Sequence, residues 1–172
     1  STTDGSDKNI AIGNYAMDGV SALAASNNVF IGYDSGGGGW TGTASSNNVA
    51  VGNKTMTSSA GNVQHNTAIG ANAMEKNDGD FNVAIGSLVM RNDGGVAGQG
   101  DGNVGIGYKV MNSASLGTAA QNVMIGTTVA TGATTANRNV ILGYESGLKL
   151  TAGADNTYIG YRSGYLVKGD SS

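Results

Sequence analysis

The sequence predicts an all-β protein, a parallel β-solenoid or β-roll of about nine coils, and three observations carry that prediction. A nine-residue unit recurs along the chain, as in "NVAVGNKTM" at 48–56 and "NVAIGSLVM" at 82–90. The unit keeps its length while the connecting segments vary, from 75–81 to the longer 91–102, which is typical of a stacked repeat. The chain has 30 glycines and no proline, which suits frequent tight turns between strands that pair their whole backbone.

Composition excludes several classes of function. Of the 172 residues only 12% are charged, and the net charge is −3, so neither a nucleic-acid nor an anionic-membrane partner is expected. The chain has no cysteine, which rules out disulfides and thiolate metal sites. No apolar run approaches the ~20 residues of a membrane-spanning helix, and no segment resembles a signal peptide.

The first position of every repeat is asparagine. Stacked coils place identical side chains above one another, and asparagine amides can then form a continuous hydrogen-bonded ladder. We therefore assign these residues a structural role rather than a ligand site. The ladder, whose members also mark the start of each coil in a single domain spanning 1–172, is Asn9, Asn28, Asn48, Asn66, Asn82, Asn103, Asn122, Asn139 and Asn156.

The fifth position is always glycine. β-Branched residues at the second and fourth positions indicate a strand, and glycine after it allows a corner with positive φ. A helix is excluded because a glycine at the centre of every unit would cost about 1 kcal/mol each time. The corner glycines are Gly13, Gly32, Gly52, Gly70, Gly86, Gly107, Gly126, Gly143 and Gly160.

The third position predicts a partner. We expect the second and fourth positions to fill the coil, so that the third lies on the opposite strand face. It carries no charged side chain and no Asn, Gln, Ser or Thr, and a strand that is apolar on both faces is buried on both. The sequence thus predicts a homo-oligomer, and its candidate subunit interface is Ala11, Phe30, Ala50, Ala68, Ala84, Gly105, Met124, Ile141 and Tyr158.

The repeat resembles two groups of trimeric proteins. "NVAIG" followed by a small-residue strand is similar to the β-roll repeats in the heads of YadA-like trimeric autotransporter adhesins. "NVFIGYDSG", "NVILGYESG" and "NTYIGYRSG" resemble repeats of bacteriophage tail-fibre proteins. The resemblance runs from Asn9 to Gly164 and implies a homotrimeric rod that displays loops. The connecting segments here are longer and more variable than those of the adhesin heads, which favours the fibre.

Little in the sequence indicates catalysis or metal binding. His65 is the only histidine and falls in a loop. The aspartates Asp78, Asp80, Asp93 and Asp101 lie in Gly-rich turns that lack the spacing of an EF-hand, so we expect solvated turns and no cofactor, with loop calcium as the alternative. Trp40, the only tryptophan, is a candidate ligand-contact residue that could stack on a sugar.

The predicted function is therefore that of a non-enzymatic structural and adhesive fibre, extracellular or on a virion surface. Its partners would be itself, as a homotrimer, and a host-surface glycan or protein. Because neither end shows a capping repeat, we expect a segment of a longer fibre. Three alternatives remain open: a self-assembling extracellular filament, an ice-binding solenoid, for which no regular threonine column exists, and a tailspike-type polysaccharide hydrolase that would use loop aspartates.

Overall fold

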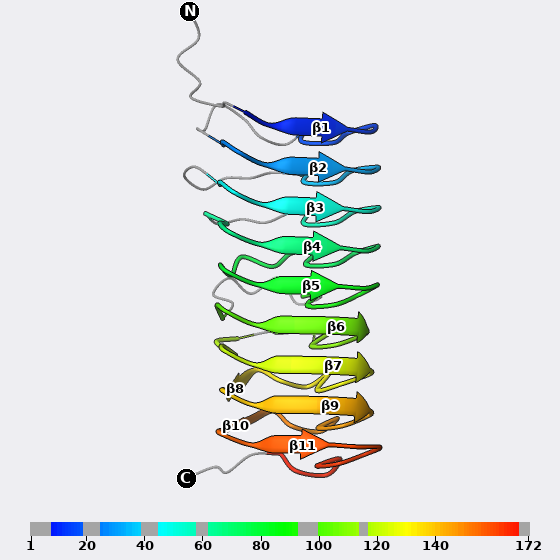
Figure 1. Cartoon of the computed structure of the whole chain (residues 1–172), viewed down its shortest axis with the longest axis vertical. Helices are drawn as coiled ribbons and strands as arrows, with labels where there is room; N and C mark the ends of the chain where they lie inside the picture. Colours follow the sequence, from blue (N-terminus) through cyan, green and yellow to red (C-terminus); the bar gives the residue numbers. More distant parts are fainter. Residues whose placement is uncertain are drawn as a thin grey trace, which may run out of the picture.

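In the computed structural model the chain is a parallel β-solenoid in which every repeat contributes one strand to a single long sheet (Figure 1). The structure describes residues 8–18, 25–38, 45–57, 62–92, 100–113 and 117–168, which trace about seven turns without a helix. The sheet contains, in order, β1 (Ile10–Ile12), β2 (Val29–Ile31), β3 (Val49–Val51), β4 (Thr67–Ile69), β5 (Val83–Ile85), β6 (Val104–Tyr108), β7 (Val123–Thr127), β9 (Val140–Tyr144) and β11 (Thr157–Ile159).

The strands pair in strict repeat register. Each second-position residue lies opposite the second-position residue of the next coil, as Val83 lies opposite Val104. The third and fourth positions follow the same rule, so identical columns run along the rod. A short second sheet of β8 (Thr135–Asn137) and β10 (Ala152–Ala154) forms in the connecting segments of the last coils. No helix that could span a bilayer occurs in the described ranges.

Each corner needs glycine for two separate reasons. The corner glycines have φ between 120° and 144°, a region that side-chain-bearing residues rarely adopt. A Cβ on Gly52 would also lie 2.6 Å from the carbonyl oxygen of Gly70 in the next coil, and a Cβ on Gly86 would overlap the carbonyl oxygen of Gly107. Glycine therefore permits both the turn and the close stacking of coils.

The interior of the coil is lined by the third, eighth and ninth positions. Ala50, Ala68 and Ala84 are fully buried, as are Phe30 and larger third-position residues further down the rod. The eighth position supplies residues such as Val89, and the ninth supplies Met56, Met74, Met90 and Met111. The core is thus a narrow column between the strand and the segment that returns beneath it.

The predicted assignment of the two strand faces was wrong. The third position fills the coil, whereas the second and fourth positions point outward and are half-buried or exposed. A side chain inside its own coil cannot form a subunit contact. This correction removes the candidate interface of Ala11, Phe30, Ala50, Ala68, Ala84, Gly105, Met124, Ile141 and Tyr158, of which only Ala11 and Tyr158, in the outermost coils, are not buried.

Size complementarity within each coil explains the correction. The third and ninth positions face each other across the interior, and where one is large the other is small. A Cβ on Gly36 would lie 2.6 Å from the Phe30 ring, and a Cβ on Gly164 would lie 2.7 Å from the Tyr158 ring. Each coil encloses about the same interior volume. Close packing therefore requires a small residue at one position wherever the other position holds a large one. The pairs are Ala11 with Met17, Phe30 with Gly36, Ala50 with Met56, Ala68 with Met74, Ala84 with Met90, Gly105 with Met111, Met124 with Ala130, Ile141 with Gly147 and Tyr158 with Gly164.

Candidate binding surfaces

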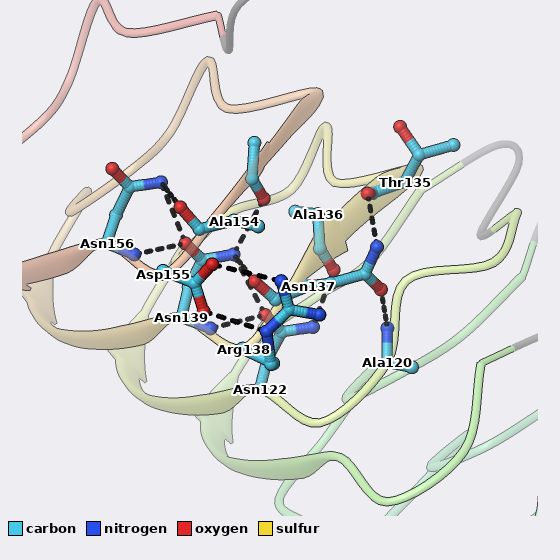
Figure 2. Close-up of polar contacts among 11 residues, drawn as sticks. Ala120, Asn122, Thr135, Ala136, Asn137, Arg138, Asn139, Ala154, Asp155 and Asn156 are labelled. Atoms are coloured by element: carbon cyan, nitrogen blue, oxygen red, sulfur yellow. Dashed lines mark hydrogen bonds and ion pairs between the residues drawn. The ribbon is translucent and has the colours of Figure 1, made fainter.

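The asparagine ladder is present, and its side-chain oxygens accept backbone N–H groups from coil to coil, while Nδ2 of Asn82 is buried without a hydrogen-bond partner among the described residues. The backbone N–H of Asn139 donates to Oδ1 of Asn122 at 2.9 Å, and the Asn139 amide donates to the same oxygen at 3.0 Å. The Asn139 amide also donates to the carbonyl of Gly153, in the connecting segment that leads to Asn156, at 3.0 Å. Figure 2 shows Asn122, Asn139 and Asn156 linked in this way. The same Oδ1-to-backbone bond joins all eight successive pairs, which supports the structural role.

Beside this ladder runs a second, shorter set of side-chain bonds that sequence reasoning missed. Two positions before a ladder asparagine, an Asp or Asn side chain accepts a backbone N–H from the coil before it. The N–H of Gln64 donates to Asp80 at 2.7 Å, and the N–H of Asp80 donates to Asp101 at 2.8 Å. The N–H of Ala120 donates to Asn137 at 2.8 Å, a contact visible in Figure 2.

These bonds give two of the turn aspartates a structural role. Asp80 and Asp101 lie in consecutive coils and cap backbone donors. Burial raises the pKa of Asp80 most, the N–H of Gln64 lowers it, and the nearby charge of Asp101 raises it further. Within the described ranges no group of three or more His, Asp or Glu side chains is placed to hold a metal ion. Asp93 and the candidate sugar-contact residue Trp40 lie outside the described residues.

An extended surface feature of the described residues is the outward face of the long sheet, formed by the second and fourth positions. None of its eighteen side chains is charged, and all are Val, Ile, Leu or Thr. Even in the middle of the rod these side chains remain open, with Ile69 39% and Ile85 37% exposed. We call this surface the outer face. Its members are Ile10, Ile12, Val29, Ile31, Val49, Val51, Thr67, Ile69, Val83, Ile85, Val104, Ile106, Val123, Ile125, Val140, Leu142, Thr157 and Ile159.

Tyrosines at the sixth position stand at one edge of the outer face. Tyr33, Tyr108, Tyr144 and Tyr161 are all exposed. Tyr144 and Tyr161 stack with ring centroids 5.8 Å apart. Beside them Glu145 and Arg162 form an ion pair between adjacent coils, with Nε of Arg162 and Oε2 of Glu145 2.6 Å apart. These rings and charges bound the outer face rather than interrupt it.

His65 lies in another exposed column, directly before the asparagines. Its ring stacks on that of Phe81, with centroids 4.9 Å apart and planes 4° from parallel. Both residues have positive φ, near 57° and 58°. No local sequence pattern connects the two residues, because their stacking follows from the register of the coils.

Comparison with known proteins gives no match: no family model, no curated protein and no solved structure is significantly similar to the chain. The fold therefore defines the class, a parallel β-solenoid repeat protein.

Proposed function

We propose that the chain is a non-enzymatic structural and adhesive rod that assembles as a homotrimer through its outer face, as a fibre segment exposed outside the cell or on a virion. The observation that carries this proposal is the outer face itself. An apolar surface that runs the length of the rod without a charge is characteristic of an interaction site rather than a solvated face.

A second copy of the chain is the occupant that fits this surface best. Its β-branched rows repeat at the strand spacing of about 4.8 Å, so nine rungs extend for roughly 40 Å. Another copy has the same spacing, and its rows can interdigitate with these along their full length. The absence of charge leaves nothing to attract a basic or acidic partner.

The number of copies in this proposal comes from the resemblance of the repeat and not from the area of the outer face. Two columns of side chains about 40 Å long cover roughly 500 Å² per chain. Two copies would bury about 1,000 Å² in one interface, at the lower limit for a specific interface, and three copies would divide about 1,500 Å² among three interfaces. Three rods around one axis match the resemblance of the repeat to trimeric adhesin and tail-fibre proteins.

The adhesive part of the proposal rests on the connecting segments. They vary in length and sequence while the rungs stay fixed, which is how a rigid scaffold presents binding residues. A host-surface glycan or protein is the partner we propose. Self-assembly into a longer filament is the alternative, and the same mass measurement separates the two.

Native mass spectrometry tests the proposal with a matched pair of variants. The wild-type chain of 17.1 kDa should be found at three times that mass. Ile85→Lys places a charge in the outer face and should give monomers, whereas Asn47→Lys adds the same charge in an exposed column outside that face and should leave the trimer intact. A monomeric wild type would contradict the trimer, and an open series of larger masses would favour the filament.

A further inference from the structure

Phe81 occupies an exposed column in which every other described member is polar or glycine. This column, which precedes the ladder asparagines, consists of Lys8, Asn27, Asn47, His65, Phe81, Gly102, Gln121, Arg138 and Asp155. Phe81 is 60% exposed and has φ near 58°, an unfavourable combination for a bulky apolar residue. The fold gains little from an aromatic ring here, so its presence calls for another explanation.

One face of the Phe81 ring is covered and the other adjoins an empty rung. His65, in the coil before, stacks on the first face at 4.9 Å. The coil after contributes Gly102, held in register by its N–H bond to the Asp80 carbonyl at 3.0 Å. A Cβ on Gly102 would meet only Cγ of Gln121, at 3.8 Å, so the Phe81 ring is not within 4 Å of it. We call this opening between Phe81 and Gln121 the Gly102 gap.

The Gly102 gap is the rung of this column that has no side chain, with Cγ of Gln121 3.8 Å from a Cβ built on Gly102. Phe81 and Gln121 belong to coils two rungs apart, a separation of about 10 Å at the strand spacing. A ring between them would lie about 4 to 5 Å from each side, which is van der Waals contact. The aromatic stack of His65 and Phe81 would simply continue by one member.

The edge of the gap is polar. Asp101 precedes Gly102, and its exposed carboxylate accepts the Asp80 N–H through Oδ1. Gln121 adds an exposed amide that can both donate and accept. An aromatic platform with carboxylate and amide groups at its rim suits a ligand that has an apolar face and hydroxyl edges. The carboxylates Asp80 and Asp101 disfavour an acidic ligand.

We propose that the Gly102 gap binds the pyranose ring of a neutral sugar, stacked on Phe81, with its hydroxyls donating to Asp101 and exchanging hydrogen bonds with Gln121. The inference rests on the proposed adhesive function and assigns it a glycan site on the rod. β-Galactosides are the first candidates, because one side of that ring presents a continuous patch of C–H bonds.

A titration with methyl β-galactoside, followed by the amide resonances of Phe81, Gly102 and Gln121, tests the site. A single hexoside should bind with a dissociation constant on the order of 1 mM. Gly102→Asn fills the gap, and asparagine already adopts the same backbone conformation in this column at Asn27 and Asn47. This variant should bind at least tenfold more weakly. The matched control Asn47→Gly opens the same column beyond His65 and should bind like the wild type.

Phe81→Leu provides a second variant, which keeps an apolar side chain but removes the planar ring. This variant should also bind the sugar at least tenfold more weakly than the wild type. The site is refuted if the wild type shows no shifts at these amides, or if both Gly102→Asn and Phe81→Leu bind as tightly as the wild type. Failure here would leave the trimer mass unchanged, and a monomeric mass would leave this titration unchanged, so the two proposals fail separately.

Discussion

The two faces of a single strand differ in what they tolerate. The inward face of β5 presents Ala84, which is fully buried in the coil interior, and the outward face presents Val83 and Ile85. The small residue lies in the core and the β-branched residues lie outside it. In this coil the returning segment supplies the bulk of the core through Met90, and the β-branched side chains of the strand are left for contacts beyond the coil.

The largest effect should separate the two faces directly. Ala84→Asp places an unpaired charge in the coil and should destabilise the fold by at least about 3 kcal/mol. Ile85→Asp, one residue away, should leave the coil folded and disrupt assembly instead. Thermal unfolding by circular dichroism, with the mass of each variant, distinguishes these outcomes. If Ala84→Asp and Ile85→Asp were both monomeric and equally destabilised, the assignment of the two faces would be contradicted.

A smaller effect should sharpen the account of the inward face. Met90→Ala leaves a cavity and should cost about 2–5 kcal/mol, and Ala84→Met overfills the coil and should cost about 1–3 kcal/mol. The double variant recreates the arrangement of Met124 and Ala130 and should recover part of the loss. Denaturant unfolding of the three variants gives the coupling energy. Strict additivity would mean that the two positions do not share one interior volume.

The corner that joins the strand to the return segment allows a matched test. Gly86 and Gly160 have nearly equal φ, 122° and 120°, but a Cβ on Gly86 would overlap the next coil whereas a Cβ on Gly160 meets nothing within 4 Å. Alanine at either position should cost about 1–3 kcal/mol in backbone strain, and at Gly86 the overlap should add roughly 2 kcal/mol. Equal losses on unfolding would show that stacking distance does not constrain the corner.

The smallest effects on stability should come from two charged side chains outside both faces, Asp155 and Asp80. The effects of these two charges should have opposite signs. The hydrogen bond from Arg138 lowers the pKa of Asp155, so this carboxylate favours the fold above its ordinary pKa of 3.8 and loses that contribution as the pH falls through its lowered value. Burial raises the pKa of Asp80, so its charge opposes the fold at neutral pH, and protonation relieves this.

Melting temperatures across this pH range check the signs. Asp80→Asn keeps the acceptor for the Gln64 N–H, as Asn137 does in the same column, and should raise the melting temperature slightly at pH 7 but not in acid. Asp155→Asn should lower it slightly at pH 7 only. A gain for Asp155→Asn at neutral pH would reverse the sign expected for this exposed pair.

The repeat made the strands, the asparagine ladder and the corner glycines predictable, because each depends on identical residues recurring at each coil. The expectation that bulky residues fill the coil assigned the inward and outward faces of the strand the wrong way round. The sequence held a better signal: positions three and nine exchange size in every repeat, as Ala84 and Met90 do, which only residues sharing one interior would do. The contact between His65 and Phe81 depends on the register of the coils and on the length of the connecting segment between them, so no local sequence pattern predicts it.

Single-cysteine labelling tests the central claim most directly, since the natural chain has no cysteine. Ala84→Cys should be protected from a thiol reagent at every chain concentration, because it lies inside its own coil. Ile85→Cys should be protected when the chain is concentrated and should react on dilution, because only other copies cover it. Rapid labelling of Ile85→Cys at high concentration would show that the outer face is not covered by other copies. Labelling of Ala84→Cys in the folded chain would reverse the assignment of the two faces.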